Sequence, residues 1–119
     1  MRSLVIKCTA GTEEPERLNQ AFTVASAAIA SGAEVTLWLT GEAVWIGVPG
    51  RAEEFALPLA GSLADARDLV IGSGALIVCS QCAARRELTE GDLVPGVRIA
   101  GAAGFAESVL ADSVQALVY

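Results

Sequence analysis

Short runs of apolar residues recur along the chain, separated by longer stretches in which apolar residues repeat every three or four positions. In the second run, the odd-numbered residues from Val35 to Leu39 face one way and Trp38 faces the other. Apolar side chains on both faces are typical of a strand that is covered on both sides. The runs predict five strands, at 3–8, 34–40, 75–79, 97–100 and 114–118.

The intervals between these runs carry helical spacing. Thr12 and the acidic residues after it suit the start of a helix that has Pro15 in its first turn, and Gly32 suits its end. Ser62 begins a second helix, with Asp65 placed for a capping contact. Shorter helices are expected at 42–47, 81–87 and 102–110. Strands that alternate with helices predict a three-layer α/β fold with a mostly parallel sheet. The 119 residues suffice for a single domain, 1–119, without linker or repeat.

The segment 41–61 departs from this alternation, because its apolar residues stand among glycines and prolines. Loops are normally polar and exposed. These apolar side chains either cover one end of the core or form a patch that meets another subunit. Because only 18% of the residues are charged, we favour the subunit interface. Its members are Trp45, Ile46, Val48, Phe55, Leu57 and Leu59.

Charge and residue usage exclude several classes of function. Eight basic and 14 acidic residues give a net charge of -6, whereas nucleic acids and anionic membranes attract clustered cations. The chain has no histidine, so Ser-His and Cys-His catalysis and His-ligated metals are excluded. We expect no cofactor and no metal. Neither a membrane span nor a signal peptide is visible, which predicts a cytoplasmic protein.

One motif carries chemical content, namely the pair Cys79 and Cys82 where the third strand meets the next helix. Ligands collect at the carboxyl ends of strands in open α/β sheets. A thiol at a helix N-terminus meets unpaired backbone N–H groups and the positive end of the helix dipole, which favour the nucleophilic thiolate. Arg85 and Arg86 either add positive potential here or are ordinary surface residues. Alternatively, both cysteines are small apolar core residues.

Further residues are expected at the same edge of the sheet. Cys8 ends the first strand and is either a resolving thiol or, in the interpretation we favour, a buried packing residue. Gly41, Glu42 and Gly101 follow the second and fourth strands. Glu42 either contacts a substrate or acts as a base, or it caps the short helix after Gly41. An odd number of cysteines is no disulfide framework, and thiols stay reduced in the cytosol.

The order and spacing of several segments resemble the DsrE/DsrF-like family, which includes the sulfur-relay subunit TusD and YchN-like proteins. The resemblance covers nearly the whole chain. It implies a Rossmann-like, YchN/DsrE-like fold that assembles into trimers or hexamers, and of homo- and hetero-oligomers we expect the homo-oligomer. The segments that carry it are the first strand with the turn at 11–17, the stretch 32–44, the motif Cys79-x-x-Cys82-x-x-Arg85, and 93–99.

The resemblance also implies a function. In sulfur-relay members, one cysteine after the third strand carries sulfur as a persulfide and passes it to a partner protein, and Cys79 matches that residue. Cys82 matches a second cysteine of YchN-like members, and such a thiol could attack the persulfide and release sulfide. We therefore expect a sulfur carrier with donor and acceptor proteins as partners. The alternatives are a non-catalytic oligomeric subunit and a thiol–disulfide redox protein that uses Cys79 and Cys82.

Overall fold

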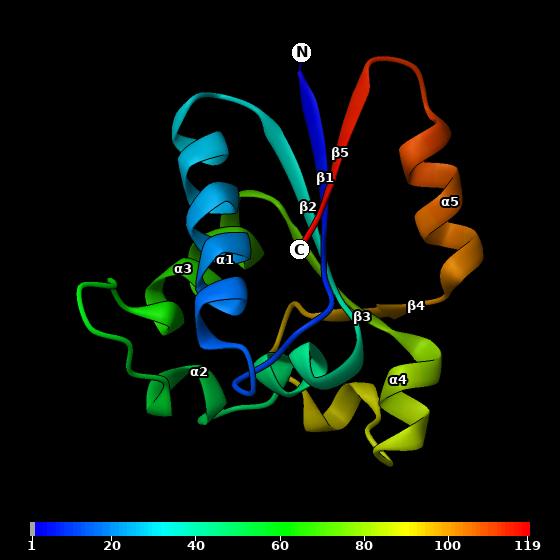
Figure 1. Ribbon diagram of the computed structural model, residues 1–119. Coiled ribbons are helices and arrows are strands. Elements are labelled where there is room, and N and C mark those ends of the chain that lie inside the picture. Colours follow the sequence, from blue (N-terminus) through cyan, green and yellow to red (C-terminus); the bar gives the residue numbers. More distant parts are fainter. Residues whose placement is uncertain (1) are drawn as a thin grey trace.

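The computed structural model describes residues 2–119, which are built around one sheet of five parallel strands (Figure 1). The strands lie side by side in the order β4-β3-β2-β1-β5. This arrangement confirms the predicted α/β fold, and two strands are one residue shorter than predicted. Their bounds are β1 (Ser3–Cys8), β2 (Glu34–Leu39), β3 (Ala75–Cys79), β4 (Arg98–Ala100) and β5 (Val114–Val118).

Helices cover both faces of the sheet and so complete three layers. On one face α1 (Pro15–Ala30) packs beside α3 (Leu63–Ser73), and on the other lies α5 (Ala102–Leu110), as Figure 1 shows. The remaining helices are short: η1 (Gly41–Gly47), α2 (Arg51–Glu54), α4 (Ser80–Arg85) and η2 (Glu90–Asp92). Within residues 2–119, no helix combines the length and apolar character that crossing a membrane requires.

The ends of the long helices follow local chemistry. The N–H of Asp65 donates to the Ser62 hydroxyl at 3.1 Å, which is the predicted cap of α3. The first helix begins later than Thr12 suggests, because the turn before it is closed by the Glu13 carboxylate, which accepts from the Gly11 N–H at 2.7 Å. Pro15 is then the first helical residue, where its missing N–H costs no hydrogen bond.

Two apolar clusters hold the layers together. The larger lies between the sheet and the α1–α3 layer and includes Phe22, Leu37 and Leu39. The smaller lies under α5 and is made by Val5, Trp38 and Ile77 with Phe105 and its neighbours. The indole of Trp38 meets the ring of Phe105 edge-on, with 5.5 Å between ring centroids. The predicted division of β2 into two apolar faces is therefore correct.

The segment 41–61 is only in part what the sequence suggests. It contains the expected short helix, η1, together with α2, which was not predicted. Ile46 is 1% exposed and belongs to the larger cluster, so the interface prediction does not extend to it, and Val48 and Phe55 also pack against that cluster. The alternative of covering the core holds for these residues. Leu59 is fully exposed and Trp45 and Leu57 are half-buried, so an interface there stays a prediction.

Candidate functional site

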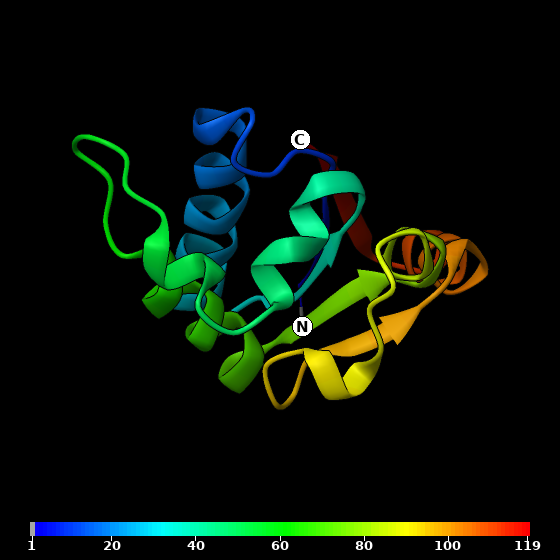
Figure 2. The same cartoon turned by 90° about the horizontal axis from the view of Figure 1, so that it is seen from below.

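The predicted cysteine pair lies where β3 runs into α4, beside η1 at the carboxyl edge of the sheet (Figure 2). Cys79 ends the strand and is the N-cap of α4, and Cys82 follows in the first turn. Both residues are half-buried, and both thiols are free. A strand that turns at once into a helix thus places two sulfur atoms at an accessible edge.

Cys79 projects to the α5 side of the sheet, because it stands two residues after Ile77, which lies under α5. Burial alone would raise the pKa of its thiol. The backbone N–H and the thiol of Cys82 act against burial, as do the backbone N–H of Gln81 and the positive charge of Lys7. Together they lower the pKa of Cys79 below its ordinary value of 9.0. A lowered pKa increases the thiolate fraction, and the thiolate is the form that attacks sulfur.

The sulfur of Cys82 connects α4 to the start of η1. It accepts a hydrogen bond from the backbone N–H of Gly41 at 3.2 Å. An Arg85 guanidinium nitrogen lies 4.0 Å from the same sulfur. Gly41 itself turns the chain with φ +56, a conformation that costs glycine little. The structure therefore brings together Cys79, Cys82, Gly41 and Arg85, as the sequence suggested.

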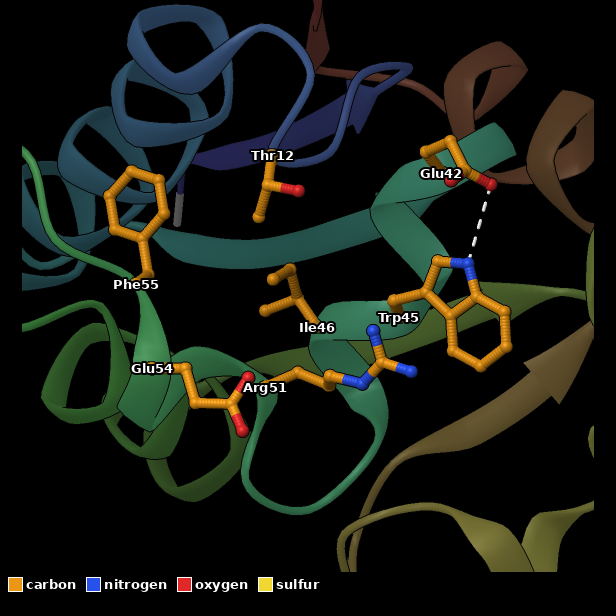
Figure 3. A pocket seen from close by; sticks show the side chains of 7 residues that line it. All are labelled: Thr12, Glu42, Trp45, Ile46, Arg51, Glu54 and Phe55. Atoms are coloured by element: carbon orange, nitrogen blue, oxygen red, sulfur yellow. Dashed lines mark hydrogen bonds between the residues drawn. The ribbon is translucent and has the colours of Figure 1, made fainter.

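Glu42 and Arg86 form a brace beside the cysteines. Arg86 binds the Glu42 carboxylate through two nitrogens, at 2.8 and 2.9 Å, and donates a third bond to the backbone carbonyl of Cys82 at 3.0 Å. The Trp45 indole N–H also donates to Glu42, at 3.3 Å (Figure 3). The bond from Arg86, with that from Trp45, lowers the pKa of Glu42. Glu42 is therefore an engaged anion, which does not favour its use as a base.

Cys8 does not line this site, which corrects its expected place at the edge, whereas its burial confirms the favoured interpretation as a packing residue. Cys8 is fully buried on the opposite face of the sheet, in the larger cluster. Its thiol donates to the carbonyl of Ala10 at 3.2 Å, and burial raises its pKa. Gly101, in contrast, does lie at the edge, since a Cβ on it would stand 3.2 Å from the Ser80 hydroxyl.

Lys7, whose positive charge helps to lower the pKa of Cys79, was not predicted from the sequence as a site residue. It is half-buried near the end of β1, and its ammonium group lies 4.1 Å from the centre of the Phe105 ring. The available signal was strand alternation, which places residue 7 on the same face as Val5 and hence under α5. The face of β1 under α5 carries Ser3, Val5 and Lys7, so only one of its residues is apolar and the alternation is hard to recognise.

A cavity of about 260 Å³ is bordered by residues of η1 and α2 (Figure 3). The guanidinium of Arg51 covers the Trp45 ring there, 4.5 Å from the ring centre. Glu42 belongs both to this cavity and to the brace, but neither Cys79 nor Cys82 lines it. The lining residues are Thr12, Glu42, Trp45, Ile46, Arg51, Glu54 and Phe55. Among residues 2–119, no three potential ligands of the Cys, Asp and Glu type are grouped as a metal would require.

Comparison with known proteins places this geometry in a family. The crystal structure of the ychN protein from E. coli superimposes with a TM-score of 0.73 at 18% identity, over 100% of both chains. The structure of MTH1491, a protein of unknown function from Methanobacterium thermoautotrophicum, superimposes with a TM-score of 0.75 at 10% identity, also over 100% of both chains. These likenesses show the fold. No curated protein sequence matches the chain. The sequence pattern of the DsrE/DsrF-like family matches residues 2–116, and the chain therefore belongs to the DsrE/DsrF-like family.

Proposed function

We propose that this protein is a sulfur carrier, in which Cys79 accepts sulfane sulfur as a persulfide and passes it to an acceptor protein. The observation that carries the proposal is the environment of Cys79, a half-buried thiol whose pKa is lowered by backbone N–H groups at a sheet edge. Membership of the DsrE/DsrF-like family, a sulfur-relay-type family, supports it.

The loading step requires no cofactor. The Cys79 thiolate attacks the terminal sulfur of a donor persulfide, R–S–SH. A new S–S bond forms on Cys79 while the donor's S–S bond breaks, so the products are Cys79–S–SH and the donor thiolate R–S⁻. In delivery, an acceptor thiolate attacks the outer sulfur of Cys79–S–SH, and Cys79 leaves as a thiolate. The backbone N–H groups of Gln81 and Cys82 stabilise the negative charge on the Cys79 sulfur in both steps.

A second candidate function is thiol–disulfide exchange, and the proximity of the two cysteines favours it, since Cys79 is the N-cap of α4 and Cys82 lies in the first turn. The Cys82 thiolate would attack the inner sulfur of Cys79–S–SH, forming the Cys79–Cys82 disulfide and expelling HS⁻. A thiol reductant would then restore the dithiol. Cys82 therefore decides whether the carrier holds its sulfur or releases it.

The proposal includes a reducing compartment and protein partners. The three cysteines are free, and a protein that works through reduced thiols needs a reducing compartment. We therefore propose that it acts in the cytoplasm. We also propose a homo-oligomer, because large apolar side chains remain exposed on the isolated chain. Leu59 is fully exposed and Leu110 is 81% exposed, so both are candidates for contacts with other copies.

The test is the intact mass of the purified protein after exposure to a persulfide donor, with and without reductant. The carrier gains one sulfur atom that reductant removes, and Cys79→Ser loses this gain while Cys8→Ser keeps it. A loss of two hydrogens without added sulfur supports the redox candidate instead. If the mass does not change and native Cys79 resists alkylation, the non-catalytic subunit is the better description. Cys82→Ser separates storage from release, since it should lengthen the life of the persulfide.

A further inference from the structure

Lys7 and Cys79 share one face of the sheet near its carboxyl edge. Lys7 pairs with Trp38 across β1 and β2, and Trp38 pairs with Ile77 across β2 and β3. These three residues therefore form a row under α5, and Cys79 stands one step further toward the edge on the same face. Lys7 and Cys79 are both half-buried on the face that α5 covers.

Phe105 holds the ammonium group in this layer. Its ring lies 4.1 Å from the Lys7 nitrogen and also packs edge-on against Trp38. The backbone N–H of Phe105 bonds to the carbonyl of Gly101, which borders Ser80 at the start of α4. The aromatic ring is thus placed one helical turn from the segment that carries the cysteines. A cation over an aromatic face is attracted to it, so the ring restrains the direction of the lysine side chain.

No carboxylate neutralises Lys7 within residues 2–119, where the ion pairs involve Arg67 and Arg86. The other charged groups near Cys79 are either paired or exposed to solvent. On α4, Arg86 is paired with Glu42, and Arg85 is exposed beside Cys82. On β4, Arg98 pairs with Ile77 and so lies on the same face as Cys79, but its side chain is exposed. On α5, Glu107 is exposed and two residues from Phe105, which places it toward the other side of the helix.

We propose that Lys7 is the counter-cation of the sulfur on Cys79, held over the Phe105 ring so that its charge stabilises the thiolate before loading and the persulfide anion after it. Lys7 is a positioning residue and does not bond to the transferred sulfur atom. The persulfide part rests on the proposed function, whereas the thiolate part does not. The lowered pKa of Cys79, to which Lys7 contributes, agrees with this assignment.

The test compares Lys7→Met with Lys7→Arg by the pH dependence of Cys79 alkylation, followed at the level of the peptide. Met keeps most of the aliphatic stem, so Lys7→Met removes the charge with little change in packing. We expect the alkylation rate of Cys79 at pH 7 to fall about three- to tenfold, and the pH midpoint to rise. Lys7→Arg should restore the rate to within about twofold of the wild type, because it returns the charge. Arg2→Met, just before the other end of β1, is the matched control and should leave the profile unchanged.

A Cys79 profile in Lys7→Met that coincides with those of the wild type and Arg2→Met would overturn the proposal. If Lys7→Met does not fold, Lys7→Gln is measured in the same way, with circular dichroism as the check on folding. Alkylation needs no sulfur donor, so its outcome is independent of whether Cys79 carries sulfur. Persulfide loading is then measured on the same variants. A shifted alkylation profile without loading in any of them retains the thiolate role of Lys7 and rejects the carrier function.

Discussion

The thiols of Cys8 and Cys79 leave the sheet on opposite faces, although each residue ends a strand at the same edge. Cys8 points into the larger cluster with Leu39 and Val78, whereas Cys79 follows Ile77 on the α5 side. Strand β2 also lies between their strands. A disulfide between the two would require one side chain to cross the sheet, so Cys8 is not the resolving partner of Cys79.

The first prediction concerns thiol reactivity in the native protein. At pH 7, Cys79 should react with iodoacetamide at least about tenfold faster than Cys8, because a lowered pKa favours the thiolate of Cys79 while burial raises the pKa of Cys8. Peptide mapping of the alkylated protein measures both rates. In denaturant the two rates should converge. Equal labelling under native conditions would show that Cys8 is accessible, contrary to its position in the core.

The second prediction concerns the Arg86–Glu42 brace. Arg86→Met removes the bonds to the Glu42 carboxylate and to the Cys82 carbonyl, which should lower the free energy of unfolding by about 0.5–1 kcal/mol. It should also speed alkylation of Cys82, because α4 then keeps only the Gly41–Cys82 hydrogen bond among its polar contacts with η1. Urea unfolding and peptide mapping measure the two effects.

Arg85→Met is the matched control for this change, since Arg85 is exposed and takes part in no ion pair found within residues 2–119. It should leave stability close to that of the wild type. Comparable losses in the two variants would mean that the brace contributes no more than an ordinary surface charge.

The third prediction is a pH dependence at the contact between α2 and α3. Arg67 is 4% exposed and binds both carboxylate oxygens of Glu53, at 2.8 and 2.9 Å, and this lowers the pKa of Glu53 from 4.5 to about 2. A carboxyl with a depressed pKa stabilises the fold above its unfolded pKa, and that contribution is lost as the pH falls through the folded value. Glu53→Gln should therefore be less stable than the wild type at pH 7, with a difference that narrows below about pH 4.5.

Urea midpoints between pH 7 and pH 3 provide the measurement. Glu54→Gln serves as the control, because Glu54 is the exposed neighbour on α2 and forms no ion pair found within residues 2–119. A constant difference between Glu53→Gln and the wild type over this range would rule out ionisation of Glu53 as the source of the stabilisation.

The sequence predicts those parts of this fold that depend on local pattern. Short apolar runs mark the strands nearly to the residue, and the junction at Cys79 follows from a strand that meets a helix without a linker. The proximity of Cys82 to Gly41 could be predicted because parallel strands end at the same edge of a sheet. These features involve short stretches of chain or a general rule of α/β sheets.

Contacts between elements that are distant along the chain could not be predicted from the sequence. The role of Lys7 depends on Phe105, which stands 98 residues later and faces Lys7 only because α5 covers that side of the sheet. Burial of Ile46 depends on how η1 folds onto the core, which the composition of a glycine- and proline-rich segment does not reveal. The bidentate contact between Arg67 and Glu53 likewise requires α2, a helix of four residues without a clear sequence signal.

The last prediction concerns two glycines with opposite surroundings. A Cβ on Gly11 would lie 2.6 Å from the backbone oxygen of Glu42, so Gly11→Ala must displace the loop or the first turn of η1. Overpacking of this kind typically costs about 1–3 kcal/mol. A Cβ on Gly72, inside α3, would meet nothing within 4 Å, and Gly72→Ala should stabilise by about 0.5–1 kcal/mol, because alanine has the higher helix propensity. Urea unfolding of both variants gives the sign of each change in the free energy of unfolding.

Because Glu42 belongs to the brace, Gly11→Ala should also speed alkylation of Cys82, while Gly72→Ala should not. An unchanged free energy of unfolding in Gly11→Ala would show that the loop can move aside without loss of stability. The close approach of Gly11 to Glu42 would then have no part in holding the cysteine edge.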